Sequence, residues 1–455
     1  MAAGTLGNFV LPGGTAMAAD YKALVCIFLY GGNDGLNTIV PTDAERYGQY
    51  SAVRKAIALP RDSLLAMSDS QFGLHPSLAA LQTSWKAKRL APVFNLGPLR
   101  APLTKAAYLS ATQGSSLIPS NLFSHSDQQI LWETGSSSAL ARTGWGGRAA
   151  DAMATTNPVI SVGGNGRFGL SNGGVPTVIP GPGGFFGVHE LGVNAYRLQY
   201  EPMRARASTL RSMYRQLQAS DLGDAYTKLQ RDAFDTADRL GAIVKSQPGD
   251  ADANPAINAG FAPLISGGKI TTALGQQLYQ AAKLIANNTL VQGTRQIFFA
   301  QMGGFDTHAS QASANPVLGT HANLLKQLGD AMAAFDAALS NLGLSNAVTT
   351  FTQSDFGRTF KPNSSNGTDH AWGNTHLVMG GAVKGGTTYG TYPSLVLGGS
   401  DDVTASGGEG RWIPTSSVDQ YAATLLRWFG ANEGQLDSIL PNLVNFGSAR
   451  QLGFV

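Results

Sequence analysis

The chain has 455 residues, of which 43% are hydrophobic and 13% are charged, and its formal net charge is +3. This length is enough to bury a large core, while the charged fraction is about half of the ~25% that is typical of globular proteins. Because the basic residues form no run, neither nucleic acid nor an anionic membrane is expected as a partner. No apolar stretch approaches the ~20 residues of a transmembrane helix, so no transmembrane segment is expected.

The N-terminal segment, residues 1–19, is uncharged, rich in Gly and Ala, and ends in Ala16-Met17-Ala18-Ala19. This ending is similar to the cleavage region of an export signal, although the basic region that opens such a signal is missing. The segment is therefore either an export-signal remnant or a disordered N-terminus. We favour export, and predict a periplasmic or secreted protein.

The first predicted element is a strand over residues 22–30, an almost wholly apolar run that stops at the motif Gly31-Gly-Asn-Asp-Gly35. A helical pattern over 78–85 follows, and then a second short apolar run over 90–96. The order strand, helix, strand is typical of a βαβ unit and predicts a parallel sheet.

The middle of the chain changes in composition twice. Residues 156–196 are rich in Gly and Pro with almost no charge, whereas 203–247 carry charged and apolar residues at helical spacing. We interpret about 156–250 as an insertion of loops or short strands followed by one or two surface helices. The rest of residues 20–455 is expected to form a single domain.

The remaining pattern again alternates between strands and helices. It predicts a strand over 293–300, an amphipathic helix over 324–342, a strand over 347–352, and a last helix over 418–429 with Ser417 as its N-cap. No internal repeat interrupts this order, so the fold class is α/β with one mostly parallel central sheet.

Acidic residues follow three of the predicted strands, namely Asp34, Asp306 and Asp355. Open α/β sheets bind ligands beyond the carboxyl ends of their strands. These three side chains are therefore expected at one edge of the sheet.

Three segments carry a carboxylate together with imidazoles or a guanidinium: Gly303-Gly-Phe-Asp306-Thr-His308, Ser354-Asp355-Phe-Gly-Arg358, and Gly367-Thr-Asp369-His370-Ala-Trp-Gly-Asn-Thr-His376. Oxygen and imidazole donors suit a divalent metal such as Zn, Mn or Ca. The same residue types also occur in turns, where Asp bonds to the backbone. Spacing alone leaves metal binding and a turn role open.

The order of these segments resembles that of the alkaline phosphatase and sulfatase superfamily. More closely, the motifs at 31–35, 303–308, 356–358 and 367–370 are similar to those of a bacterial sulfatase-like family of unknown function, of the twin-arginine-exported type, within that superfamily. The resemblance spans roughly residues 22–430. It implies an alkaline-phosphatase-like three-layer sandwich with a mostly parallel sheet and a Gly-rich and helical insertion.

The resemblance also implies a set of metal ligands: Asp34, Asp306, His308, Asp355, Asp369, His370 and His376. Two positions depart from the superfamily pattern. The residue after Asp355 is Phe356, where sulfatases and phosphatases have His, and Gln301 stands where phosphatases carry a Glu for a third metal.

Three further residues are candidates for catalysis. Ser124 precedes a helical pattern and could be a nucleophile at a helix N-terminus, with the helix cap as its alternative role and His125 as a supporting or surface residue. Arg358 could hold an anionic oxygen or form a salt bridge with Asp355. Asn33 could donate to a substrate oxygen or stabilise its turn.

The first functional hypothesis is an exported, metal-dependent hydrolase of small phosphate or sulfate esters. The second is a non-catalytic binding or assembly protein at the cell surface with a protein partner, which Phe356 and Gln301 favour. A phosphomutase or sugar-modifying enzyme is a third possibility, and it would need a phosphorylated Ser or Thr.

Overall fold

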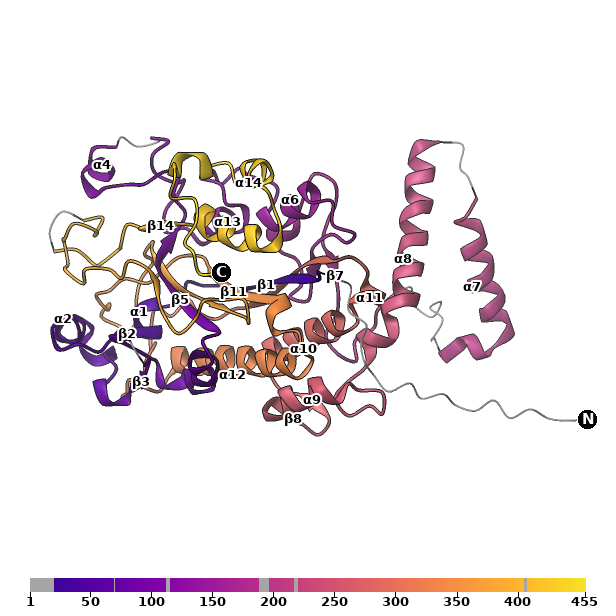
Figure 1. Cartoon of the computed structure of the whole chain (residues 1–455), viewed down its shortest axis with the longest axis horizontal. Coiled ribbons are helices and arrows are strands. Elements are labelled where there is room, and N and C mark those ends of the chain that lie inside the picture. Colours follow the sequence, from indigo (N-terminus) through magenta and orange to yellow (C-terminus); the bar gives the residue numbers. More distant parts are fainter. Residues whose placement is uncertain (1–19, 69, 112–114, 188–195, 217–219, 405–406) are drawn as a thin grey trace, which may run out of the picture.

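The computed structural model describes residues 20–68, 70–111, 115–187, 196–216, 220–404 and 407–455. The predicted export-signal remnant at residues 1–19 lies outside them. The described elements form a three-layer α/β sandwich, with helices on both faces of one large sheet (Figure 1). None of the helices in this part of the chain has the length and apolar character needed to cross a membrane.

The central sheet has nine strands within the described residues, in the order β13-β5-β12-β11-β1-β10-β6-β7, with β14 beside β5. Their bounds are β1 (Lys22–Leu29), β5 (Leu90–Gly97), β6 (Ile160–Ser161), β7 (Thr177–Val178), β10 (Arg295–Met302), β11 (Val348–Ser354), β12 (Asn374–Met379), β13 (Tyr389–Gly390) and β14 (Ser416–Ser417). Only β12 runs antiparallel to its neighbours, so the predicted mostly parallel sheet is confirmed.

The two faces of the sheet are covered because alternate residues of a strand point in opposite directions. Ala23, Val25 and Ile27 of β1 pack against one helical layer, and Leu24 and Cys26 against the other. The first layer contains α3 (Gln82–Lys86), α9 (Pro255–Phe261), α10 (Ala273–Ala286) and α12 (Thr320–Asn341). The second contains α5 (His125–Thr134), α6 (Trp145–Ala152), α13 (Val418–Phe429) and α14 (Glu433–Ile439).

Most predicted elements are confirmed, including α12, α13 and the two helices of the middle region. Ser417 caps α13, with its side chain accepting from the backbone of Gln420 in a capping box. The helix over 418–429 is not the last one, because a second capping box at Asn432 starts α14. Part of the predicted helix over 78–85 is the 3₁₀ helix η3 (Pro76–Leu81).

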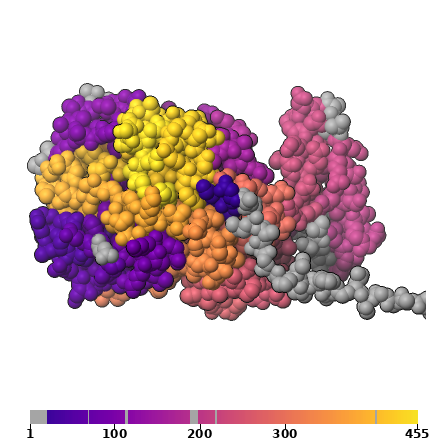
Figure 2. Space-filling view, in the orientation of Figure 1, coloured from indigo at the N-terminus to yellow at the C-terminus, as the bar shows by residue number. Residues whose placement is uncertain are grey.

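The helices of the middle region are α7 (Glu201–Met213) and α8 (Asp221–Lys245), which lie side by side and project from the rest of the molecule (Figures 1 and 2), while Leu240 and Val244 near the C-terminal end of α8 pack in the main core. Phe234 and Ala207 pack between them, and Arg211 pairs with Asp238 at 2.5 Å. The division of the chain into one domain with an insertion stays a prediction.

The remaining strands and α-helices of the described residues are short, apart from α2. They are β2 (Ile39–Pro41), β3 (Leu65–Ala66) and β4 (Phe72–Leu74) in one small sheet, β8 (Ile265–Ser266) and β9 (Lys269–Ile270) in another, and the helices α1 (Gly35–Thr38), α2 (Ala44–Arg54), α4 (Lys105–Ser110) and α11 (Asn288–Val291).

Candidate metal centre

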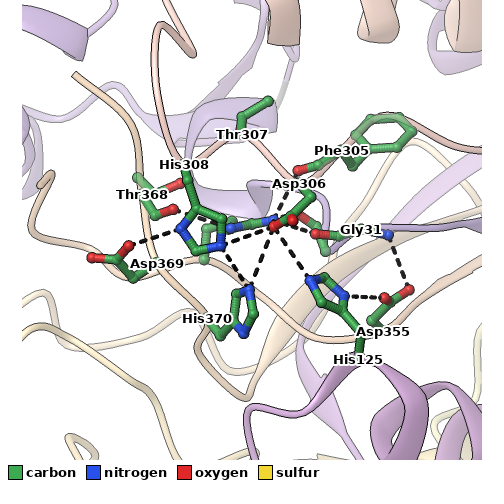
Figure 3. A network of polar contacts seen from close by, with 12 residues as sticks. Gly31, His125, Phe305, Asp306, Thr307, His308, Asp355, Thr368, Asp369 and His370 are labelled. Atoms are coloured by element: carbon green, nitrogen blue, oxygen red, sulfur yellow. Dashed lines mark hydrogen bonds and ion pairs between the residues drawn. The ribbon is translucent and has the colours of Figure 1, made fainter. Parts of the chain in front are cut away.

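The carboxyl ends of β10 and β11 carry a group of histidines and aspartates (Figure 3). Asp306 and His308 lie in the loop after β10, and Asp355 directly follows β11. His370 comes from the loop between β11 and β12, while His125 is the first residue of α5. Segments far apart in the sequence therefore meet at the edge where an open α/β sheet binds its ligands.

Asp306 is at the centre of this group. Its Oδ1 lies 3.3 Å from Nε2 of His125, 3.1 Å from Nε2 of His308 and 3.4 Å from Nε2 of His370. The Nε2 atoms of His308 and His370 are 2.8 Å apart. His125, Asp306 and His370 together have the arrangement of a metal-binding triplet, and His308 adjoins two of its members.

The other ring nitrogen of each histidine is held by an acceptor. Nδ1 of His125 lies 2.6 Å from Asp355, Nδ1 of His308 lies 2.9 Å from Asp369, and Nδ1 of His370 lies 2.7 Å from the carbonyl oxygen of Phe123. Carbonyl and ionised carboxylate oxygens only accept, so each Nδ1 carries a hydrogen. In the neutral rings, the Nε2 lone pairs therefore point toward the centre.

The close approach of the two rings is compatible with a cation between them. With hydrogen on both Nδ1 atoms, the Nε2 atoms of His308 and His370, 2.8 Å apart, offer two lone pairs to one cation. Nε2 of His125 is buried and has no hydrogen-bond partner among the described residues. Donors placed tetrahedrally about 2.1 Å from one ion are about 3.4 Å apart, and the spacings of 2.8, 3.1, 3.3 and 3.4 Å here are at or below that value.

The charges of the group favour ionised carboxylates. Burial opposes ionisation of Asp306, but the Arg358 guanidinium and the nearby histidines outweigh it and lower its pKa. The pKa of Asp369 is lowered in the same way by the hydrogen bond from His308, against the effect of burial. The hydrogen bond to Asp355 raises the pKa of His125, whereas burial lowers that of His370.

Asp355 is fully buried and serves as a hydrogen-bond acceptor behind His125. Its Oδ2 also accepts from Gln129 at 2.9 Å, and its Oδ1 accepts from the backbone N–H of Gly31 at 3.1 Å. Gly31 has φ +113°, and a Cβ there would lie 2.4 Å from the Asp306 nitrogen. Only glycine lets the first loop approach the loop of Asp306 so closely.

Arg358 has a different place from the one expected for an anion-binding residue. It is 1% exposed, and all three of its nitrogens donate to the protein, to four backbone carbonyls and to Asp306. Its salt-bridge partner is Asp306 and not Asp355. With its donors engaged inside the protein, Arg358 fixes the central carboxylate and does not face a substrate.

Two of the expected ligands and Asn33 lie away from the centre. Asp34 is buried and pairs with Arg54 at 2.6 Å, so its carboxylate is engaged elsewhere. His376 is buried in β12, with Nδ1 3.2 Å from Thr352. Asn33 uses its amide internally, accepting from His321 at 3.0 Å. Asp355 and Asp369 are connected to the centre by their hydrogen bonds to His125 and His308.

The structure also shows the contacts of the other residues singled out in the sequence. Ser124 is at the N-cap of α5, but its hydroxyl makes no capping bond and lies 3.2 Å from that of Ser126. The ring of Phe356 is buried, and its centroid lies 4.8 Å from that of His125 and 4.5 Å from that of His370. It therefore packs as an apolar surface against both imidazoles. Gln301 is remote, donating to the carbonyl of Gly163.

His125 is the member of the centre to which sequence reasoning gave no ligand role. The sequence feature that could have indicated it is its position at the start of the helical pattern that became α5. The carbonyl of Phe123 was also missed, and Phe123 has φ +76°, a left-handed conformation that costs a non-glycine residue about 1–3 kcal/mol. This strained turn directs the carbonyl at His370.

Comparison with known proteins gives a family and no function. The curated proteins contain no match to this chain. Among solved structures, the crystal structure of Ps i-CgsB in complex with k-i-k-neocarrahexaose is 11% identical, and the alignment covers 94% of this chain and 77% of that one with a TM-score of 0.36. A score this low carries no argument. The family described as "Protein of unknown function (DUF1501)" matches residues 21–405, so the chain belongs to that family.

Proposed function

We propose that this protein is an exported, metal-dependent hydrolase of phosphate or sulfate esters. The observation that carries the proposal is the convergence of three Nε2 atoms on Asp306, with each Nδ1 held by an acceptor. Metal-binding histidines have this arrangement, because a partner at one nitrogen fixes the ring and leaves the other lone pair free.

The proposed ligands are His125, Asp306, His308 and His370. Three imidazoles with one carboxylate suit Zn or Mn better than Ca, which prefers oxygen donors. Asp355 and Asp369 would then orient two of the rings. This differs from the ligand set implied by the superfamily resemblance, in which Asp34 and His376 bind metal directly.

The exposure of the centre suits a substrate site. The side chains of Asp306 and His308 are 45% and 43% exposed, so a small ester can reach the centre from solvent. A bound divalent ion would polarise the ester and lower the pKa of a nearby hydroxyl or water. The buried Arg358 holds the carboxylate of Asp306 in place throughout.

Ser124 remains the proposed nucleophile. It precedes the ligand His125 directly, its hydroxyl is not used to cap α5, and the N-terminus of a helix favours an anionic group. The motif resemblance to sulfatases and phosphatases supports a phosphate or sulfate ester as the substrate. The Ala-rich ending of residues 1–19 supports export to the periplasm or beyond.

The test is hydrolysis of aryl phosphate and aryl sulfate esters by the metal-loaded protein. Ser124→Ala should abolish turnover while retaining metal. Ser126→Ala, which removes the neighbouring hydroxyl, should retain both metal and turnover. Bound metal without turnover of either ester would instead favour the non-catalytic binding or assembly protein. Full turnover by Ser124→Ala would remove that residue as the nucleophile.

A further inference from the structure

A chain of buried polar side chains connects the first loop of the sheet to the loops of the metal centre. Both terminal nitrogens of Arg54 donate to Asp34, at 2.6 and 2.9 Å. Nε2 of Gln311 donates to the same carboxylate at 2.6 Å. All three side chains are at most 1% exposed, so these groups have little water to pair with.

The carboxylate of Asp34 sets the orientation of the Gln311 amide. An ionised carboxylate only accepts hydrogen bonds, and the pairing with Arg54 keeps it ionised: burial opposes ionisation, but the guanidinium outweighs it and lowers the pKa of Asp34. The amide must therefore present its NH₂ to Asp34 and its oxygen to the other side. There, Oε1 accepts from the hydroxyls of Thr307 at 2.9 Å and Thr368 at 2.6 Å.

The two threonines adjoin the proposed ligands. Thr307 lies between Asp306 and His308, and Thr368 directly precedes the pair Asp369-His370 (Figure 3). The backbone N–H of Thr368 also donates to the carbonyl of Thr307 at 3.1 Å. Because both hydroxyls bind one oxygen atom, Gln311 fixes the loop after β10 relative to the loop after β11.

We infer that Asp34, Arg54 and Gln311 are positioning residues for the metal centre, acting through Thr307 and Thr368. The inference rests on the proposed function, since it assigns these residues to the same centre. Residues that orient ligands typically change metal affinity about 10–100-fold when they are replaced. The first-strand aspartate thus supports the ligands from behind and binds no metal itself.

A purely structural role would give a different result, and the chain offers a matched control. Asp336 forms another mostly buried pair, with Arg89 at 2.8 Å, and accepts from Ser84 at 2.7 Å. This pair joins α12 to the segment before β5. Asp336→Asn should therefore lower stability without changing the metal centre.

The experiment compares the full-length wild type with Thr368→Val, Thr368→Ser, Gln311→Leu and Asp336→Asn. Zinc affinity is measured by competition titration, and hydrogen exchange is followed in residues 303–319 and 355–373. Thr368→Val and Gln311→Leu should weaken zinc binding about 10-fold or more and speed exchange in both loops. Thr368→Ser, which keeps the hydroxyl, should have zinc affinity and loop exchange close to those of the wild type. Asp336→Asn should leave both properties unchanged.

Each outcome bears on one idea. Wild-type affinity in Thr368→Val and Gln311→Leu would overturn the inference, as would unchanged exchange in both loops or an equal loss in Asp336→Asn. If the wild type binds no metal, the proposed function fails and the assignment to a metal centre fails with it, and faster exchange of both loops in the two variants would then show only a structural role. Thr368→Val keeps the test available if Gln311→Leu does not fold.

Discussion

The bond between His125 and Asp355 is the shortest side-chain contact that holds an imidazole in the centre, at 2.6 Å. Asp355→Asn should reduce metal affinity about 10–100-fold, because an amide is a weaker acceptor and can also present its NH₂ to the ring. The same change should lower the pKa of His125. Metal titration and histidine NMR would measure the two effects.

The control for this prediction is Gln129→Ala, which removes the other side-chain donor to Asp355 Oδ2 but leaves its bond to His125. Its metal affinity should stay closer to that of the wild type. An Asp355→Asn variant that binds metal as tightly as the wild type would contradict the orienting role of this carboxylate.

A second residue-scale prediction concerns the stability of the Arg54 and Asp34 pair. Arg54→Met should lower the free energy of unfolding by about 3–5 kcal/mol, because it leaves a buried carboxylate without its charge partner. Chemical denaturation at neutral pH would measure the loss. The double variant Arg54→Met/Asp34→Asn should regain part of it, and a single variant within 1 kcal/mol of the wild type would contradict the prediction.

At the residue scale, the sequence predicts where polar groups lie better than what they contact. Asp306 and His308 lie in one short motif and His370 in another, and the structure brings the two motifs together. Asp34 matches a ligand position in sequence, yet it pairs with Arg54, 20 residues away. Partners so distant along the chain leave no local signal, so its role could not be inferred from its motif.

At the scale of elements, the long periodic segments are those that the sequence predicts well. The runs that form β1, β10 and β11 are almost wholly apolar or rich in β-formers, and α12 has a clear apolar stripe. The helix α14 has only seven residues, too few for a periodic apolar stripe, although its capping-box residues Asn432 and Gln435 are visible in the sequence. Short elements thus escape detection by periodicity.

Lys283 of α10 fastens the C-terminal end of α8. Its ammonium donates to the carbonyls of Ile243 at 2.7 Å and Val244 at 3.2 Å, where helix carbonyls lack intrahelical partners. Burial lowers the pKa of Lys283 to about 7. Lys283→Met should therefore speed hydrogen exchange in the last turns of α8 and cost about 1–3 kcal/mol of stability.

The control is Lys228→Met, which removes an exposed (i, i+4) pair with Asp232 on the same helix. It should change stability by less than about 0.5 kcal/mol. Equal protection of α8 in Lys283→Met and in the wild type would show that the helix is held by other contacts.

At the scale of the whole molecule, the core contains histidines that must be neutral in the folded state. Burial lowers the pKa of His75 to about 3, of His321 to about 4 and of His376 to about 3. In the unfolded chain they titrate at about 6.5, so between these values the unfolded state binds more protons. Stability is therefore complete above about pH 6.5 and is lost as the pH falls.

Each such histidine contributes up to about 1.4 kcal/mol per pH unit in this window. Asp419 opposes them, because burial raises its pKa to about 7 and the folded state takes up its proton first. Three such histidines outnumber this one carboxyl, so stability should fall between pH 7 and pH 5, as measured by denaturant unfolding. His376→Leu should reduce the slope, and stability independent of pH would contradict neutral core histidines.

The fold brings segments that are far apart in the sequence to one edge of the sheet, and the central claim is that this edge binds a divalent metal. The most direct measurement is elemental analysis of the purified wild type beside Asp306→Asn and His376→Gln, with folding checked by circular dichroism. Near-stoichiometric zinc or manganese in the wild type and in His376→Gln, lost in Asp306→Asn, is the predicted result. Folded wild type without metal, or metal retained by Asp306→Asn, would contradict the claim.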